Sequence, residues 1–378
     1  MTEYQGTEAN NLKSETIMEL PEQIIRYEIF TRLPVKSLVR FKSVCKSWLS
    51  LLSDPKFAKE HYHISAMLNP NEYDCLLALK CQTKLVSLTR LEETRIVPLD
   101  RHNSRQQYEL IGSIHGLVCL RQDKELWLWN PAIHQSKEFT LPRAHTHGWR
   151  KPSRDYFGFG FDHVSNDYKV VLLSTSYERM SSAYVYSYNS DAWSPLIVPD
   201  YFCPEYVFPF PCEREVSIVK DCPYWTLYCR NWSDEFVVLK HLKFEIGSNE
   251  FRLLPEFQWK SGKFTTLVNM MDRPSLMDYE QNSGNISVDV YSLDEENGVW
   301  SKMYSVGPIA NYGLRRNLSQ GFKYGGEIVF EAGGMFSYYD QETDRIIPIP
   351  GESCFSAASC YRYTPSLVYL EGMTVDTP

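Results

Sequence analysis

The residues whose types and spacing could support catalysis are few, and each group has a simpler structural interpretation. Ser113 and His115 lie between two glycines in Gly112-Ser-Ile-His-Gly116, but this order differs from the G-x-S-x-G turn that exposes a nucleophilic serine. Gly158-Phe-Gly160 lacks the third glycine and the following helix of a dinucleotide-binding loop. Glycines in these positions more simply permit a close approach between neighbouring strands.

Metal and glycosidase chemistry are no better supported. His145 and His147 could offer two metal ligands from one loop, but no convincing third ligand accompanies them. Asp289, Asp294 and Glu295 could act as glycosidase carboxylates, yet carboxylates at hairpin turns are usually solvated. We therefore expect a protein that is not an enzyme and that holds no metal and no cofactor.

The composition is that of a folded protein with an acidic balance. Of the 378 residues, 43% are hydrophobic and 23% are charged, which is enough apolar content for a sizeable core. The net charge of −8 argues against nucleic acid or an anionic membrane as a general partner. The 10 cysteines include no C-x-x-C pair, so we expect buried free thiols rather than a zinc site or a disulfide framework.

The sequence shows no targeting or membrane signal. Residues 1–19 are polar and acidic, without the apolar stretch of a signal peptide. No apolar run approaches the ~18 residues of a membrane helix. We expect residues 1–19 to form a flexible tail, and the protein to be soluble, to bind no membrane and to reside in the cytoplasm and/or nucleus.

Residues 20–66 have the apolar spacing of three to four short helices. The repeated apolar positions are Ile25, Ile29 and Leu33, then Leu38 and Phe41, then Val44, Trp48 and Leu52. Pro34 ends the first helix, and Asp54-Pro55 is typical of the start of the last one. A unit this small buries little apolar surface by itself, so we expect its apolar stripes to need a partner.

From about residue 70 the periodicity changes to alternating strands, and one hairpin plan repeats. Each repeat ends a strand on an aromatic residue, turns through polar residues and begins a return strand. The repeats are Trp129–Phe139, Tyr186–Trp193, Phe244–Phe251, Tyr291–Trp300 and Tyr339–Ile346, whose starts are separated by 57, 58, 47 and 48 residues. Hairpins recurring at ~40–50 residues are typical of propeller blades, and an antiparallel sandwich is the competing interpretation.

The fold that these patterns predict is mainly β with a small N-terminal α bundle. Residues 67–378 have the length of about six blades, so we expect a β-propeller-like domain there. The apolar segment Ser366–Leu370 could close the ring by pairing with a strand after residue 70. We expect few contacts between residues 1–66 and the rest.

Two stretches of the sequence resemble a known family. Leu33-Pro-Val-Lys-Ser-Leu-Val-Arg-Phe-Lys-Ser-Val-Cys-Lys-Ser-Trp48, with the preceding residues from Leu20, closely resembles the F-box motif of plant F-box proteins. The family usually has one residue fewer before Leu33, so Arg26-Tyr27 resembles an insertion. An extra residue rotates the preceding part of a helix by about 100°.

The remainder resembles the F-box-associated, kelch-like domain that follows this motif in the plant family. The segments that carry the resemblance are Ile111–Leu120, Leu128-Trp-Asn-Pro-Ala132, Gly158-Phe-Gly-Phe-Asp162, Asn166-Asp-Tyr-Lys-Val-Val171 and Tyr363-Thr-Pro-Ser-Leu-Val368. The resemblance implies an F-box over residues 20–66 and a substrate-recognition domain over residues 67–378.

This resemblance implies a substrate receptor of an SCF (Skp–cullin–F-box) ubiquitin ligase. The F-box would bind a Skp-type adaptor, and through it cullin and the RING subunit, while the propeller would hold an unidentified protein for ubiquitination. The implied adaptor-binding residues are Leu20, Pro21, Ile25, Ile29, Leu33, Pro34, Val35, Leu38, Val39, Phe41, Val44, Cys45, Trp48 and Leu52. Large apolar side chains usually dominate such interfaces, so Leu38, Phe41 and Trp48 are the expected anchors.

Two alternatives stay open from the sequence alone. The chain could be a ligand-binding propeller, for glycans or with hydrolytic activity, that carries an F-box. The aromatic stretch from Pro199 to Trp232 could form a contact surface for the target or belong to the blade core.

Overall fold

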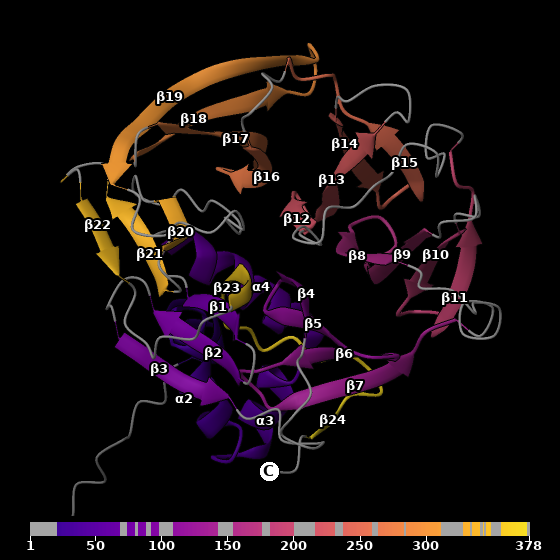
Figure 1. Cartoon of the computed structure of the whole chain (residues 1–378). Helices are drawn as coiled ribbons and strands as arrows, with labels where there is room; N and C mark the ends of the chain where they lie inside the picture. The colour runs from indigo at the N-terminus through magenta and orange to yellow at the C-terminus, as the bar shows by residue number, and fades with distance from the viewer. Residues whose placement is uncertain are drawn as a thin grey trace, which may run out of the picture.

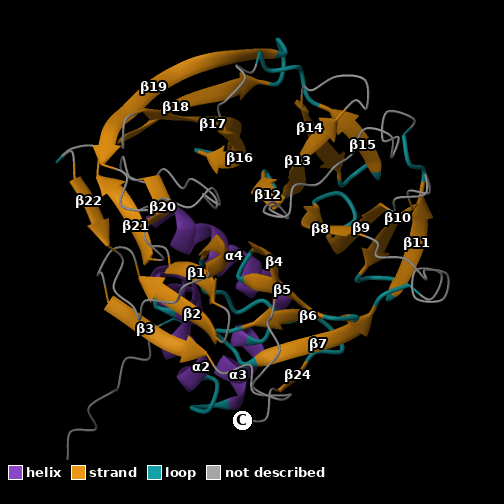
Figure 2. Ribbon diagram, in the orientation of Figure 1, coloured by secondary structure: helices purple, strands orange, loops and turns teal. Residues whose placement is uncertain are grey.

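The described helices lie together in Figure 2, and they precede every described strand in the sequence. The computed structural model describes residues 21–68, 74–79, 82–87, 92–97, 109–142, 154–175, 182–199, 216–230, 237–258, 264–282, 285–310, 328–332, 335–340, 343, 345–348 and 357–375. The helical elements are α1 (Glu22–Ile24), the π-helix η1 (Ile25–Ile29), the 3₁₀-helix η2 (Phe30–Arg32), α2 (Val35–Phe41), α3 (Lys46–Leu52) and α4 (Pro55–Leu68). The predicted fold class, mainly β with short N-terminal helices, is confirmed.

Six antiparallel sheets form a ring, each sheet being one blade (Figure 1). Blade 1 contains β23 (Ala357–Tyr363), β1 (Asp74–Leu79), β2 (Gln82–Ser87) and β3 (Glu92–Val97). Blade 2 contains β4 (Glu109–Ile114), β5 (Leu117–Gln122), β6 (Glu125–Asn130), β7 (Gln135–Thr140) and β24 (Thr374–Val375). Blade 3 contains β8 (Arg154–Asp162), β9 (Asp167–Thr175), β10 (Ser182–Ser187) and β11 (Ala192–Leu196).

The other three blades complete the ring. Blade 4 contains β12 (Val216–Val219), β13 (Cys222–Arg230), β14 (Val237–Glu245) and β15 (Glu250–Leu253). Blade 5 contains β16 (Phe264–Met270), β17 (Arg273–Asn282), β18 (Asn285–Asp294) and β19 (Val299–Ala310). The described strands of blade 6 are β20 (Ile328–Ala332), β21 (Met335–Asp340) and β22 (Arg345–Pro348).

The repeated hairpin of the sequence is the outer hairpin of a blade. In blades 2 to 5 it joins the third strand to the fourth, and in blade 6 it joins β21 to β22. The aromatic residues also connect neighbouring blades: Trp193 donates from Nε1 to the carbonyl of Thr140, and Trp300 donates from Nε1 to the carbonyl of Pro255. The repeat therefore supplies both the fold of each blade and its contact with the preceding one.

The ring is closed by a C-terminal strand other than the predicted one. β23 pairs with β1, so Tyr363 lies opposite Asp74 and Cys360 opposite Leu77. The expectation that Ser366–Leu370 forms the closing strand is wrong. That segment instead passes next to blade 2, where Asn130 Nδ2 donates to the carbonyls of Ser366 (3.1 Å) and Val368 (2.8 Å).

Glycines allow adjacent blades to approach closely, as the sequence indicates. A β-carbon on Gly158 in blade 3 would lie 2.4 Å from the Trp225 ring in the adjacent blade 4. Gly112 allows the inner strand of blade 2 to approach the inner strand of blade 4, because a β-carbon there would lie 2.3 Å from Ile218 Cδ1. Within the described residues, no helix has the length and apolar character needed to cross a bilayer.

The helical unit packs onto the propeller, which differs from the expectation of few contacts. Leu367 from the C-terminal segment is buried in one cluster with Phe30, Leu38 and Phe57. Ala132 and Ile133 from the β6–β7 turn, together with partly buried helical residues, pack against the same cluster. The helical unit, the β6–β7 turn and the C-terminal segment, which are distant in the sequence, therefore share one apolar core.

Candidate functional site

The helical unit has its own small core, which fixes the positions of its surface residues. Phe30, Phe41 and Trp48 form an aromatic trio with ring centroids 4.9 to 5.9 Å apart. His61 from α4 lies 2.8 Å from the carbonyl of Leu33 through Nε2, which ties the last helix to the turn before α2. Burial, the largest effect, lowers the pKa of His61 below its usual range. A neutral imidazole is therefore part of this core.

The structure divides the predicted adaptor-binding residues by exposure. Val35, Leu38 and Leu52 are buried; Ile25, Leu33, Val39, Phe41 and Trp48 are partly buried; Pro21, Ile29, Pro34, Val44 and Cys45 are exposed; Leu20 lies outside the described residues. Leu38, one of the expected anchors, has 0% exposure and packs within the chain itself. In the isolated chain the available part of the predicted surface is therefore the exposed subset.

Exposed apolar side chains are concentrated on this small unit. Seven of the fourteen exposed large hydrophobic residues found in the described part of the chain lie between residues 21 and 68. Five of them belong to α1, η1, the α2–α3 turn and α3: Ile24 (42%), Tyr27 (48%), Ile29 (36%), Val44 (60%) and Leu49 (47%). We call these five residues the apolar surface. Such exposure on a folded unit is typical of a protein-contact surface.

Three members of the apolar surface were absent from the sequence prediction. Ile24, Tyr27 and Leu49 were not among the residues that the F-box resemblance implied. Leu49 was detectable in principle, because it follows Cys45 by one helical turn and so extends the exposed side of α3. Ile24 and Tyr27 were not detectable, because their direction depends on a local change of helix type.

That change is the π-helix η1. It spans Ile25–Ile29 and therefore contains Arg26 and Tyr27, where the sequence has one residue more than the family usually has. A π turn accommodates one extra residue within the turn. The residues before it are therefore not rotated by 100° relative to the rest of the helix. Thr31 Oγ1 donates to the carbonyl of Tyr27 at 2.6 Å, which satisfies one of the backbone groups of the altered turn.

Arg26 fixes the π turn to the last helix. Its Nη2 lies 3.4 Å from Glu60 Oε2, and its guanidinium lies 5.1 Å from the Tyr27 ring centroid and 5.9 Å from that of Phe57. The apolar surface is therefore held by contacts between elements as well as by the helices themselves.

Basic residues accompany the apolar surface on α2, the α2–α3 turn and the start of α3, while the acidic Glu28 beside Tyr27 and Ile29 is paired with Arg32. Lys36, Arg40 and Lys46 are exposed, while burial lowers the pKa of the half-buried Lys42 below its usual range. Cys45 is an exposed free thiol, unlike the buried thiols expected from the sequence, and hydrogen bonds to Ser47 and the Trp48 backbone lower its pKa. An acidic partner would find both charge and apolar complementarity here.

The residues considered for catalysis have structural roles. The Asp294 carboxylate accepts hydrogen bonds from the backbone of Glu296 and Asn297 within its turn, and Asp289 pairs with Lys302 at 2.8 Å. Glu295 accepts hydrogen bonds from Lys243 and Tyr224. His145 and His147 lie outside the described residues, and within those residues no group of His, Cys, Asp or Glu is placed to hold a metal ion.

The aromatic stretch from Pro199 to Trp232 is described only at residue 199 and residues 216–230. Tyr224 and Trp225 are fully buried on β13, and Trp225 Nε1 donates to the carbonyl of Phe157 in the adjoining blade. These two aromatics belong to the blade core, and the rest of the stretch lies outside the part that is described.

The fold and the apolar surface define a two-part protein, with a small helical docking unit joined to a β-propeller. The F-box domain model matches residues 17–60, and the model for the F-box associated beta propeller domain matches residues 75–370. The chain belongs to the family of plant F-box proteins that carry an F-box associated β-propeller domain. The resemblance found in the sequence is confirmed.

Individual relatives agree with the family assignment. An F-box/kelch-repeat protein of Arabidopsis thaliana is 34% identical over 182 residues, covering 44% of this chain and 48% of that protein. A second Arabidopsis thaliana F-box/kelch-repeat protein is 26% identical over 321 residues, covering 80% of each chain. A putative F-box protein of the same plant is 28% identical over 238 residues, covering 62% of this chain and 60% of that protein. The chain thus spans about half of the first relative and less than two thirds of the third.

One solved structure shows a distant likeness in fold. A polysaccharide lyase of the ulvan lyase family superposes with a TM-score of 0.41 at 10% identity, covering 73% of this chain and 71% of that chain. A likeness at this level says nothing about activity.

Proposed function

We propose that the chain is the substrate-recognition subunit of an SCF ubiquitin ligase, acting in the cytoplasm and/or nucleus. The apolar surface binds a Skp-type adaptor, which connects the chain to cullin and the RING subunit. The propeller holds the protein that is to be ubiquitinated. The chain itself performs no catalysis in this scheme.

The observation that carries the proposal is the exposure of large apolar side chains on a unit that also has a packed core. Val44 (60%) precedes α3 and Leu49 (47%) lies within it, and the helix ends at the buried Leu52. Exposed apolar side chains on a packed helical unit suit an interface, because binding does not then require the backbone of that unit to become ordered.

The arrangement of the propeller suggests which side holds the target. α4 lies against the side that bears the first hairpin turns of blades 2 and 3, near His115 and Asn166. Successive antiparallel strands alternate in direction, so second turns such as Asp123–Lys124 lie on the opposite side. We place the target on that opposite side, which the helices leave uncovered.

The test is a calorimetric titration of the full-length chain with a Skp-type adaptor. Val44→Asp and Leu49→Asp should each weaken the Kd at least about tenfold, because each would bury a charge in an apolar interface. Both side chains are exposed, so the variants should stay folded.

Met67→Asp is the matched control. Met67 is 80% exposed near the end of α4, away from α3, and the same substitution there should leave the Kd unchanged. An unaltered Kd in both test variants would place the adaptor elsewhere.

A further inference from the structure

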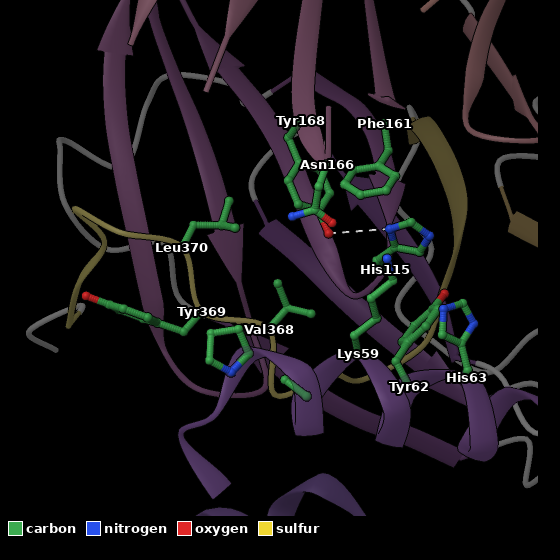
Figure 3. Close-up of a pocket in the computed structure, with 12 residues that line it drawn as sticks. Lys59, Tyr62, His63, His115, Phe161, Asn166, Tyr168, Val368, Tyr369 and Leu370 are labelled. Atoms are coloured by element: carbon green, nitrogen blue, oxygen red, sulfur yellow. Dashed lines mark hydrogen bonds between the residues drawn. The ribbon is translucent and has the colours of Figure 1, made fainter. Parts of the chain in front are cut away.

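A pocket of ≈ 90 Å³ lies where α4 meets the propeller. Figure 3 shows Lys59, Tyr62 and His63 extending from α4 toward His115, with Asn166 and Tyr168 on the far side. His115 comes from the β4–β5 turn and Asn166 from the β8–β9 turn, while residues 368–370 form an apolar wall. This volume is several times the roughly 10–15 Å³ needed for one water, so the pocket has room for a group of several atoms.

Three solvent-exposed polar side chains that line this pocket have no hydrogen-bond or ion-pair partner among the described residues. The Lys59 ammonium, the His63 imidazole and the Asn166 amide form neither a hydrogen bond nor an ion pair there; Lys59 has only a ring contact, 6.0 Å from the Phe161 centroid. An ammonium and an amide NH₂ are hydrogen-bond donors, and an imidazole can become one. The pocket therefore offers donors from both sides of the joint.

The nearby carboxylate is already occupied. Asp221 Oδ2 lies 2.9 Å from His163 Nε2 and 3.3 Å from His115 Nε2. On its other side, His115 Nδ1 lies 3.4 Å from the Tyr168 hydroxyl, so His115 can donate to Asp221 while it accepts from Tyr168. Asp221 therefore interacts with the two histidines and forms no ion pair with Lys59.

The electrostatics of His63 would favour a bound anion. Burial lowers the pKa of His63, the neighbouring His115, Lys59 and His163 lower it further, and Asp221 raises it. Protonation of His63 near the Lys59 ammonium is therefore disfavoured at this joint. An anion bound there would offset this repulsion.

We propose that this pocket binds a small oxyanion, either a phosphate or the carboxylate group of a small ligand. Lys59 and Asn166 donate hydrogen bonds to its oxygens, and His63 joins them when protonated. Because the donors come from α4 and from blade 3, the bound anion joins the helical unit to the propeller. This proposal is independent of adaptor binding.

The experiment is thermal unfolding of the full-length chain with inorganic phosphate, sulfate or acetate, each compared with sodium chloride at equal ionic strength. A ligand that binds only the folded chain raises the Tm with its concentration, from which a Kd follows. A rise in Tm with phosphate or sulfate identifies a tetrahedral oxyanion as the ligand. A rise with acetate alone identifies a carboxylate. With sulfate or acetate, whose charges do not change over this range, the Kd should be tighter at pH 6 than at pH 8, because protonated His63 adds a charge.

Lys59→Met should weaken the Kd about tenfold or more, since a charge-assisted hydrogen bond is lost. Lys56→Met, an exposed lysine one turn earlier on α4, is the matched control and should leave it unchanged. Asn166→Asp is a second variant, which keeps the shape and places a negative charge in the pocket. Its backbone φ of 52° is one that Asp also adopts. A Tm rise equal to that in chloride, or one retained in both variants, would overturn the proposal.

Discussion

At the scale of single residues, burial decides what a side chain in the helical unit can do. Leu38 and Leu52 are fully buried, so a change there acts first on the stability of the unit. Val44 and Leu49 lie at the surface, so a change there acts on binding. The F-box resemblance named Leu38 and Val44 alike, because a helical repeat shows which residues are apolar but not which side of a thin bundle stays open.

Blade 3 contains a buried ion pair that makes stability depend on pH. Asp162 and Lys169 are 6% and 7% exposed, and Lys169 Nζ lies 2.9 Å from Asp162 Oδ2. Burial by itself would raise the pKa of Asp162, but hydrogen bonds from Ser165, Lys169 and the Val164 backbone outweigh it and lower the pKa to about 2. The carboxylate is thus favoured in the folded state.

We expect this pair to contribute stability above pH 4 that is lost as the pH falls from about 4 toward 2. The folded-state pKa lies below the unfolded value of about 3.9, so protonation favours unfolding, with a contribution of up to about 2 kcal/mol. Asp162→Asn should remove this part of the acid dependence. Urea unfolding of both proteins at pH 7 and pH 3 measures it, and an identical loss of stability on acidification would contradict it.

At the scale of elements, contacts between blades depend on small residues facing large ones. Gly158 on β8 faces β13, where a β-carbon would lie 2.4 Å from Trp225 and 2.7 Å from Pro223. The Trp225 indole cannot move away without losing its 2.8 Å hydrogen bond to the Phe157 carbonyl. The glycine is therefore required by the neighbouring blade rather than by its own strand.

Gly158→Ala should lower the free energy of unfolding by about 1–3 kcal/mol, the usual cost of overpacking a core. Gly247→Ala is the matched control, because a β-carbon there meets nothing within 4 Å. Chemical denaturation of the two variants and the parent protein measures the difference. Equal stability of Gly158→Ala and the parent would mean that blades 3 and 4 can separate without cost.

The sequence predicted the elements better than their partners. The five aromatic hairpins were predicted because each places its signal within about ten residues, as in Tyr186–Trp193. The closing strand was mispredicted because β23 contains Ser359, Cys360 and Arg362, whereas Ser366–Leu370 is more apolar. Which strand closes the ring is set by the geometry of the whole sheet, and no local pattern encodes it.

The pocket could not be predicted from the sequence, because it too depends on the geometry of the whole ring. It joins Lys59, His115, Asn166 and Val368, which are separated by up to about three hundred residues in the sequence. Ser113 and His115 were considered for catalysis, and only the ring places His115 beneath α4. Residues that meet through turns of different blades leave no spacing that a reader of the sequence could recognise.

At the scale of the whole molecule, the helical unit and the propeller share an apolar core, but the propeller ring closes without any residue of the helical unit. The ring begins at β1 and closes through β23, so residues 67–378 contain every described strand. The helices nevertheless cover Leu367, which is 1% exposed, and α4 covers the pocket side. At that contact burial, with a smaller effect of Asp221, raises the pKa of Tyr62 to about 12.

We therefore expect a fragment of residues 67–378 to fold as a propeller but to melt at a lower temperature than the full-length chain. Its ring can still close, but Leu367 loses the apolar residues that cover it. Burying one leucine side chain contributes about 1.5–3 kcal/mol to stability. Circular dichroism should show strand content with a reduced Tm. In cells the fragment should still capture the target without recruiting the ligase, and so should protect the target from degradation.

A fragment of residues 67–356 is the control that separates closure from cover. It lacks β23 and so leaves β1 without its inner neighbour, and it should lose the cooperative transition altogether. If residues 67–378 melted at the same temperature as the full chain, the helices would add nothing to the propeller. If they failed to fold while the full chain folded, the shared core around Leu367 would be essential, and the two parts would form a single folding unit.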